Sequence, residues 1–277
     1  MSTTQAHAAI EPRRRYAHVI AAVDDEHGGG RAAATASSLA AAIGAQLHVF
    51  HAESHWDRRE SGMHRLAQEL AKRYGGQAHV GAEGTADRSP VELMDELADR
   101  LGNAALCVAA RGHSARTEPI FGSVTAELIR QTGRAVIVAG PRLEVGVDVS
   151  RVIVGLDGSP YARAVLPEAA GWAAALGVPL WLVEVLDPGA AGSGPAESST
   201  VRAEARRIDA AGLDVEWEVL HGAHPARSLV DWAATVPGSM LAIATHGRTG
   251  VRAVLSGSVA TEVIRRAPAP VLVQHPA

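Results

Sequence analysis

Cysteine and aromatic side chains are scarce in this chain of 277 residues. It contains one Cys, two Phe and three Tyr, and aromatic residues make up only 4% of it. The single Cys107 cannot form an intramolecular disulfide, which excludes a disulfide scaffold and fits a reducing cytosol. Because Cys107 lies in the apolar run 104–110, we expect its thiol to be buried and unreactive. The core must therefore be built mainly from Ala, Val, Leu and Ile.

Long apolar runs and an excess of positive charge are also absent. No run approaches the roughly 18 apolar residues that a membrane-spanning helix needs. Residues 1–12 lack the apolar segment of a secretory signal. The formal net charge of −4 argues against a general nucleic-acid-binding protein. We therefore expect a cytoplasmic protein that binds neither a membrane nor nucleic acid.

The common sequence signatures of catalysis and metal binding are missing as well. No glycine loop continues into Gly-Lys-Ser/Thr, and no Gly-x-Gly-x-x-Gly follows the first predicted strand. There is no Gly-x-Ser-x-Gly elbow and no convincing Ser-His-Asp set. None of the 13 histidines belongs to a cluster with metal-site spacing. We expect the histidines to be scattered over the surface, predict no metal site and no catalytic residue, and favour a binding protein over an efficient enzyme.

What the chain does contain is an internal repeat. Nine residues separate the outer glycines of each copy, and the offset between the copies is 135. The two copies read Gly112-HSARTEPIF-Gly122-Ser123-Val124 and Gly247-RTGVRAVLS-Gly257-Ser258-Val259. The repeat predicts two domains, at 16–142 and 150–277, each long enough to bury its own core.

Strands and helices alternate in each half. Short β-branched runs at 18–24 and 151–157 are typical of strands covered on both faces. Glycine-containing turns and Ala-rich helices are predicted to follow them, with the helices at about 31–43 and 161–176. Five strands are predicted in each half, which indicates two tandem α/β domains with parallel sheets.

Ligands of such sheets bind beyond the carboxyl ends of the strands, at the switch point in strand order. Asp24, Asp157 and both glycine loops fall at those ends. Ser123 and Ser258 each open a predicted helix directly after a glycine, and a helix N-terminus presents unpaired N–H groups that suit a phosphate. A structural interpretation stays open beside this one, because Gly-Ser is ordinary helix capping and Asp157 can be a turn-capping residue.

The combined pattern resembles the universal stress protein family in tandem form, over about 20–141 and 151–276. The resemblance is carried by Val152-IVGLDG-Ser159, Ala244-THGRTGVRAVLSGS-Val259 and Ala267-PAPVL-Val273, and in weaker form by Val19-IAAVD-Asp25, Ala109-ARGHSARTEPIFGS-Val124 and Ala135-VIVAG-Pro141. It implies two five-stranded, Rossmann-like domains of the adenine-nucleotide α-hydrolase-like type. It also implies ATP as ligand, with or without Mg²⁺, and pairing through the last strands, here as an intramolecular pseudo-dimer that can dimerise further.

The resemblance also implies individual roles. Asp157 would contact adenine or ribose, Gly155 would line the ribose side, and Val185 would offer backbone groups to adenine. The phosphates would be held by Gly247, Gly250, Gly257, Ser258 and Val259. Independently of the resemblance, the charge of Arg248 could neutralise phosphate, with an ordinary solvated loop as the alternative. The counterparts in the first half would be Asp24, Val49 or Phe50, Gly112, Gly122, Ser123 and Val124.

The first half departs further from the family pattern than the second. The first glycine of the family loop is replaced in both halves, by Ala109 and Ala244. In addition, the first half has Ala22 where the second has a glycine, and its first turn carries Asp25 and Glu26. Extra carboxylates near a triphosphate are unfavourable without a cation. We therefore predict that the second half holds the better site and that the protein is a regulatory ATP sensor without efficient catalysis. The alternatives are a slow ATP hydrolase and a stress scaffold that binds no nucleotide.

Overall fold

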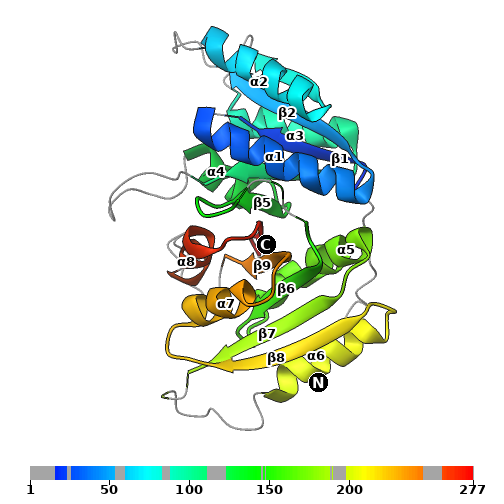
Figure 1. The fold of residues 1–277 in the computed structure, drawn as a ribbon, viewed down its shortest axis with the longest axis vertical. Coiled ribbons are helices and arrows are strands. Elements are labelled where there is room, and N and C mark those ends of the chain that lie inside the picture. The colour runs from blue at the N-terminus through cyan, green and yellow to red at the C-terminus, as the bar shows by residue number, and fades with distance from the viewer. Residues whose placement is uncertain are drawn as a thin grey trace, which may run out of the picture.

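One continuous sheet of ten strands forms the centre of the molecule (Figure 1). The computed structural model describes residues 16–23, 26–53, 60–82, 88–110, 123–144, 146, 148–187, 189, 198–245 and 258–276. The order of the strands is β3-β2-β1-β4-β5-β10-β9-β6-β7-β8. Each half of the chain therefore contributes five neighbouring strands.

The first half consists of a parallel sheet in which the order reverses between β1 and β4. Its elements are β1 (His18–Ala22), α1 (Glu26–Ile43), β2 (Gln46–Glu53), α2 (Glu60–Tyr74), β3 (Gln77–Ala82), α3 (Pro90–Leu101), β4 (Ala104–Ala109), α4 (Ser123–Gln131) and β5 (Val136–Ala139).

The second half repeats this arrangement, with its switch point between β6 and β9. Its elements are β6 (Arg151–Leu156), a 3₁₀ helix (Ala162–Val165), α5 (Leu166–Leu176), β7 (Leu180–Leu186), α6 (Ser198–Asp209), β8 (Val215–His221), α7 (Pro225–Ala234), β9 (Ser239–Ala244), α8 (Ser258–Arg266) and β10 (Val271–Gln274). The predicted fold class, two tandem α/β domains of Rossmann-like type, is confirmed.

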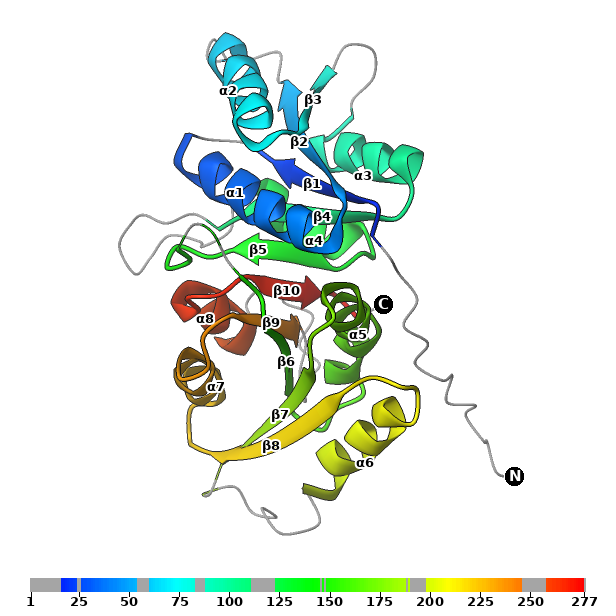
Figure 2. The same cartoon turned by 45° about the vertical axis from the view of Figure 1, so that its right-hand side comes forward.

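Helices cover both faces of the sheet (Figure 2). Alternate residues of each central strand point to opposite faces, and apolar side chains on both faces pack against these helices. Val19 of β1 packs in a core layer with α1 and α2, whereas Ile20 packs in the opposite layer with α3 and α4. Val152 and Ile153 of β6 divide in the same way between α5 and α6 on one face and α7 and α8 on the other. As expected from the composition, most of the buried side chains are Ala, Val, Leu and Ile.

Cys107 lies in the middle of β4 and is completely buried. Its Sγ is 3.5 Å from the carbonyl oxygen of Ala32. Burial raises the pKa of the Cys107 thiol to about 12, because the thiolate would lose its hydration. The expectation of a buried cysteine is confirmed, and the raised pKa keeps the thiol protonated at neutral pH.

The two halves meet where β5 and β10 pair in antiparallel fashion, with Ile137 opposite Leu272. A second contact stacks Tyr16 on Trp172, with ring centroids 4.6 Å apart, and the Tyr16 hydroxyl donates to Glu168 of α5. Gly140, directly after β5, comes so close to α8 that an added Cβ would lie 2.5 Å from the carbonyl oxygen of Ile264. Strand pairing, aromatic stacking and close backbone packing thus all join the halves.

The start of α1 differs from the prediction. The glycines 28–30 were expected in a turn, but α1 begins at Glu26 and includes them. Gly29 packs against the end of β1 so tightly that an added Cβ would lie 2.4 Å from Cγ1 of Val23. Glycine is thus needed there for close approach of the helix to the strand rather than for a turn.

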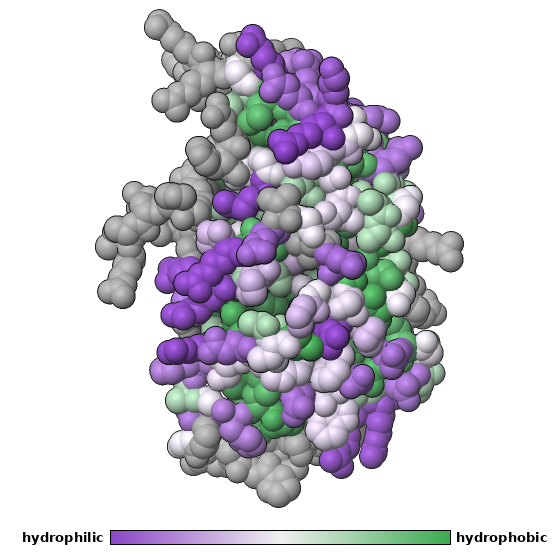
Figure 3. Space-filling model, in the orientation of Figure 1, coloured by the Kyte–Doolittle hydropathy of each residue, from purple (hydrophilic) through white to green (hydrophobic). Residues whose placement is uncertain are grey.

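No helix in the described part of the chain is long and apolar enough to cross a membrane. On the face that Figure 3 shows, hydrophilic residues are spread over both halves and alternate with smaller apolar areas.

Candidate functional site

The switch point of the second half brings together three segments at the carboxyl ends of its strands. Asp157 directly follows β6, Thr245 directly follows β9, and Ser258 begins α8. Because β6 and β9 are neighbours in the sheet, Asp157 and the loop from β9 to α8 start at the same edge. This is where the sequence predicts an anion site, and Ser258 begins a helix as predicted.

Asp157 holds the turn that follows β6. Its Oδ1 accepts a hydrogen bond of 2.9 Å from the backbone N–H of Ser159, and the Ser159 hydroxyl oxygen accepts one of 3.1 Å from the N–H of Ala162. Gly158 between them has a φ of +77°, which favours glycine. The capping role that the sequence left open for Asp157 is therefore present. A carboxylate can accept several hydrogen bonds, so this contact is compatible with a ligand as well.

Gly155 has a packing role on the face that α7 covers. A Cβ added to it would lie 2.8 Å from Cδ2 of Leu229 and 3.4 Å from Cγ2 of Ile243. Its side-chain direction is therefore occupied by the core. Any contact of Gly155 with a ligand would have to use its backbone.

Val185 is the first residue of β7 beyond the pairing with β6, which ends at the pair of Leu156 and Glu184. Val185 itself pairs with Leu220 of β8. Ala22 of the first half corresponds to Gly155, and these residues pair with Phe50 and Val183, so Phe50 corresponds to Val183. Two residues further along both strands, Ala52 is therefore the counterpart of Val185. The expected counterparts Val49 and Phe50 are thus two to three residues too early.

Two contacts of Thr245 at the end of β9 were not predicted from the sequence. The buried Thr245 donates its N–H to the carbonyl of Gln274 at 3.0 Å, and its hydroxyl lies 2.9 Å from Nδ1 of His275. Both contacts fix the point at which the glycine loop leaves the sheet. The partner residues lie 29 and 30 positions away along the chain, so no local motif announces them.

An ionic cluster around a buried carboxylate lies beside the Asp157 turn and was also missed. Glu204 of α6 is 7% exposed, with Oε1 3.1 Å from Nε of Arg163 and Oε2 3.1 Å from Nη2 of Arg207. Arg163 belongs to the 3₁₀ helix that the turn initiates. Glu204 therefore ties α6 to the turn. A small void of about 10 Å³ between these segments leaves room for no ligand.

The counterpart in the first half differs in the described residues. Ser123 begins α4, as predicted, but Val124 is half-buried whereas Val259 at the same place in α8 is 42% exposed. Arg31 of α1, another residue missed in the sequence, donates from Nη2 to the carbonyl of Ala110 at 2.7 Å, just past β4. The side chain of Arg31 thus reaches the carboxyl end of β4 at the first half's switch point.

Several predicted site residues lie outside the described part of the chain. They are Asp24, Gly112, Gly122, Gly247, Arg248, Gly250 and Gly257.

The histidines are not all scattered over the surface, which corrects the expectation from the sequence. His48 and His51 are buried, and His18, His48 and His79 form a row of hydrogen-bonded rings across three strands. Among the described residues, no group of three or more His, Cys, Asp or Glu is arranged to hold a metal ion. Strand register, which the sequence does not reveal, aligns the row.

One family model matches this chain twice. It is described as the universal stress protein family and covers residues 15–139 and 149–275. Universal stress protein Rv2005c of Mycobacterium tuberculosis is 31% identical over 204 residues, which are 67% of this chain and 65% of that protein. The match thus spans slightly less than two thirds of the relative's own length.

A solved structure of the same family shares the fold. A universal stress protein from Archaeoglobus fulgidus DSM 4304 has a TM-score of 0.67 and 18% identity, covering 94% of this chain and 98% of that chain. A universal stress protein solved in complex with cAMP is 30% identical, covers 47% of this chain and 99% of that chain, and has a TM-score of 0.39. The two matches of the family model span nearly the whole ten-stranded sheet, and this chain belongs to the universal stress protein family, in tandem form.

Proposed function

We propose that the second half binds an adenine nucleotide, ATP, and that the protein is a nucleotide sensor rather than an efficient enzyme. The observation that carries the proposal is the convergence of Asp157, after β6, with Thr245 and Ser258, the two ends of the glycine loop, at one switch point. Open parallel sheets bind their ligands at such points.

The described residues around the switch point fit such a ligand. The N-terminus of α8 carries unpaired N–H groups and a partial positive charge. The first turn of α8 is accessible, since Val259 is 42% exposed. Val185 continues β7 past the pairing with β6, where an adenine ring could lie beside strand backbone. In this proposal Asp157 and the backbone of Gly155 contact the nucleoside.

The phosphate side is assigned to the loop and the helix that follows it. Gly247, Arg248, Gly250 and Gly257 would hold the phosphates, together with the backbone of Ser258 and Val259. The negative charge of the nucleotide, with or without Mg²⁺, is what this positive helix end stabilises. The corresponding residues of the first half, Asp24, Gly112, Gly122, Ser123 and Val124, form the weaker candidate, because Asp25 and Glu26 follow Asp24 in the sequence and their carboxylates repel phosphate.

The hydrogen bond of the Asp157 carboxylate within its own turn favours binding over catalysis. Asp157 directly follows β6, and its Oδ1 already accepts the N–H of Ser159. A general base must be within reach of the proton that it removes, and Asp157 is engaged in shaping the turn. The slow hydrolase remains the alternative from the enzyme class.

The experiment is calorimetric titration of the full chain with ATP, ATP plus Mg²⁺, and AMP. A carboxylate placed in the loop repels phosphate, so Gly257→Asp should weaken binding at least about tenfold. The matched change Gly122→Asp in the first half should leave the affinity nearly unchanged. No heat from ATP or AMP at high protein concentration would refute the proposal. Steady phosphate release that disappears in Gly257→Asp would favour the hydrolase instead.

The wider organisation belongs to the same proposal. We assign the domains to 16–142 and 150–277, with the halves as an intramolecular pseudo-dimer that can form a homodimer, in the cytoplasm. The antiparallel pairing of β5 with β10 supports the pseudo-dimer. Light scattering at several concentrations measures whether a further dimer forms.

A further inference from the structure

A row of three imidazole rings crosses the sheet of the first half, in the amino-terminal halves of its strands. His18 is the first residue of β1, and its Nδ1 lies 2.9 Å from Nε2 of His48 on β2. Nδ1 of His48 lies 2.8 Å from Nε2 of His79 on β3. His48 is only 1% exposed. The three rings therefore form one continuous hydrogen-bonded unit on the face that α3 covers.

The number of protons that this row can hold follows from its geometry. Three neutral imidazoles carry three ring protons, and two of them fill the two hydrogen bonds. The third proton lies on one of the two outer nitrogens, Nε2 of His18 or Nδ1 of His79. One additional proton can take the remaining outer nitrogen while both bonds persist. A second would put two N–H groups face to face, so the row accepts one proton without losing a hydrogen bond.

The second half shows that the fold does not require these histidines. By strand register, the positions of His18 and His48 are taken there by Arg151 and Trp181, and that of His79 by Glu218. Trp181 packs against Trp232 of α7, with ring centroids 5.4 Å apart. The histidine row is thus a feature of the first half alone.

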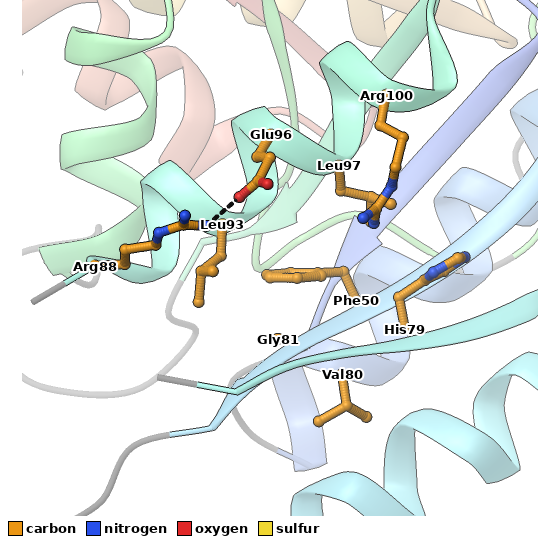
Figure 4. A pocket seen from close by; sticks show the side chains of 9 residues that line it. All are labelled: Phe50, His79, Val80, Gly81, Arg88, Leu93, Glu96, Leu97 and Arg100. Carbon is orange, nitrogen blue, oxygen red and sulfur yellow. Dashed lines mark hydrogen bonds and ion pairs between the residues drawn. The ribbon is translucent and has the colours of Figure 1, made fainter. Parts of the chain in front are cut away.

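A groove of about 270 Å³ lies next to the row, between α3 and β3 (Figure 4). Phe50, Leu93 and Leu97 give it an apolar lining. Figure 4 shows Arg100 reaching from α3 towards His79 and Phe50. One end of the groove is therefore cationic, and its lining includes the aromatic ring of Phe50 and the apolar side chains of Leu93 and Leu97. The volume is just below the usual range of about 300–1,000 Å³ for ligand pockets and suits only a small molecule.

The charges around the groove leave one positive charge uncompensated. Arg88 is paired with Glu96, Nη1 to Oε2 at 2.5 Å, so these two neutralise each other. Asp95 and Asp99, also on α3, bind Arg134 near α4 instead. Arg100 has no carboxylate partner in the described part of the chain. A ligand with a single negative charge would balance it.

We propose that this groove binds a small monocarboxylate with a flat apolar body, and that the histidine row takes up one proton with it. The carboxylate would lie at Arg100 and His79, where a planar guanidinium offers two parallel donors. The apolar body would cover Phe50 and Leu93. This site is independent of the nucleotide site proposed for the second half.

The sign of the coupling follows from the charges. In the empty groove, burial and the neighbouring His79 and His18 lower the pKa of His48 to about 4. Burial, and then the positive charge of Arg100, lower the pKa of His79. A bound carboxylate neutralises Arg100 and adds a negative charge beside the row, so it raises the pKa of the row. Binding must then take up a proton and strengthen as the pH falls.

The test is calorimetric titration of the full chain with benzoate, repeated in two buffers of different ionisation enthalpy to count protons. Between the ordinary histidine pKa of about 6.5 and the lowered pKa of about 4 for His48 in the empty groove, the affinity should rise as the pH falls, by at most about tenfold per pH unit. Benzyl alcohol, which has a similar shape and no charge, should bind at least about tenfold more weakly. Equal binding of the two probes would overturn the proposal.

Three variants separate the site from general effects on folding, which thermal unfolding monitors. Arg100→Leu should weaken benzoate about tenfold, with Arg100→Gln as a replacement if the leucine variant fails to fold. Arg227→Leu removes an exposed arginine from α7 and should change nothing. His79→Gln should remove the pH dependence and the proton uptake. Unchanged benzoate affinity in Arg100→Leu, or unchanged proton uptake in His79→Gln, would refute the assignment.

Discussion

The substitution Gly140→Ala adds one methyl group where β5 meets α8, and it tests how closely the two halves pack. Gly140 directly follows β5 of the first half, and a Cβ there would lie 2.5 Å from the carbonyl oxygen of Ile264 in the second half. Real Cβ contacts are essentially never shorter than 3.0 Å, so something must shift. The atom in the way is backbone in a helix, which cannot turn aside as a flexible side chain can. Gly140→Ala must therefore push α8 away from β5.

The expected cost can be estimated from opposing terms. Overpacking a well-packed region costs about 1–3 kcal/mol. Replacing a glycine whose φ is not positive gains about 0.4–1 kcal/mol, because the unfolded chain loses freedom. Gly140 is not among the glycines with positive φ. The midpoints of these two ranges give a net destabilisation of about 1.3 kcal/mol for Gly140→Ala.

Urea unfolding followed by tryptophan fluorescence measures this free energy, and four of the five tryptophans, Trp172, Trp181, Trp217 and Trp232, report on the second half. The control is Gly30→Ala in α1, where an added Cβ meets no atom within 4 Å. That change should stabilise the helix by about 0.5–1 kcal/mol. A Gly140→Ala protein as stable as the parent, beside a stabilised Gly30→Ala, would show that the halves do not pack this closely.

Three further predictions concern single groups. Asp157→Ala should lower the free energy of unfolding by about 1 kcal/mol, because the turn loses the carboxylate that accepts the N–H of Ser159. Asp157→Asn keeps an acceptor oxygen and should be more stable than the alanine variant. Equal unfolding midpoints for the two variants would contradict the capping role. Cys107 should resist a thiol reagent at about pH 8 until the protein unfolds, because its pKa is raised to about 12; fast labelling of the native protein would contradict its burial. The lowered pKa of His48 predicts that stability falls as the pH drops from 6.5 towards about 4, because unfolding then binds a proton. His48→Phe should flatten this part of the pH profile, and an unchanged profile would mean that His48 is not the group that titrates.

The fold could be predicted because each strand and helix is marked by residues within its own segment. Uniformly apolar runs mark the parallel strands, and Pro90 and Pro225 stand in the first turns of α3 and α7. Ser89 and Glu92 form a reciprocal capping box at the start of α3. Strands that alternate with helices leave few topologies, and the repeat doubles the result.

What the sequence did not reveal depends on partners that are distant along the chain. The start of α1 was missed because three glycines look like a turn, whereas Gly29 is small in order to pack on Val23. The histidine row depends on the register of three strands, and a shift by one residue would point each ring to the other face. Thr245 with His275 and Glu204 with Arg163 are likewise pairs with no local motif.

The two halves keep one scaffold and differ at the places where a ligand can bind. At the carboxyl ends, Arg31 hydrogen-bonds to the carbonyl of Ala110 at the first half's switch point, while the first turn of α8 in the second half is accessible at Val259. Beneath α3, the first half has an open groove beside His79. In the corresponding layer beneath α7, the second half has the packed side chains of Trp181 and Trp232 instead. A duplicated domain needs both copies to hold the shared sheet together through β5 and β10, but that pairing places no demand on either pocket. The two sites are therefore free to differ, and a change that weakens binding at one, such as Gly257→Asp or Arg100→Leu, should leave binding at the other intact.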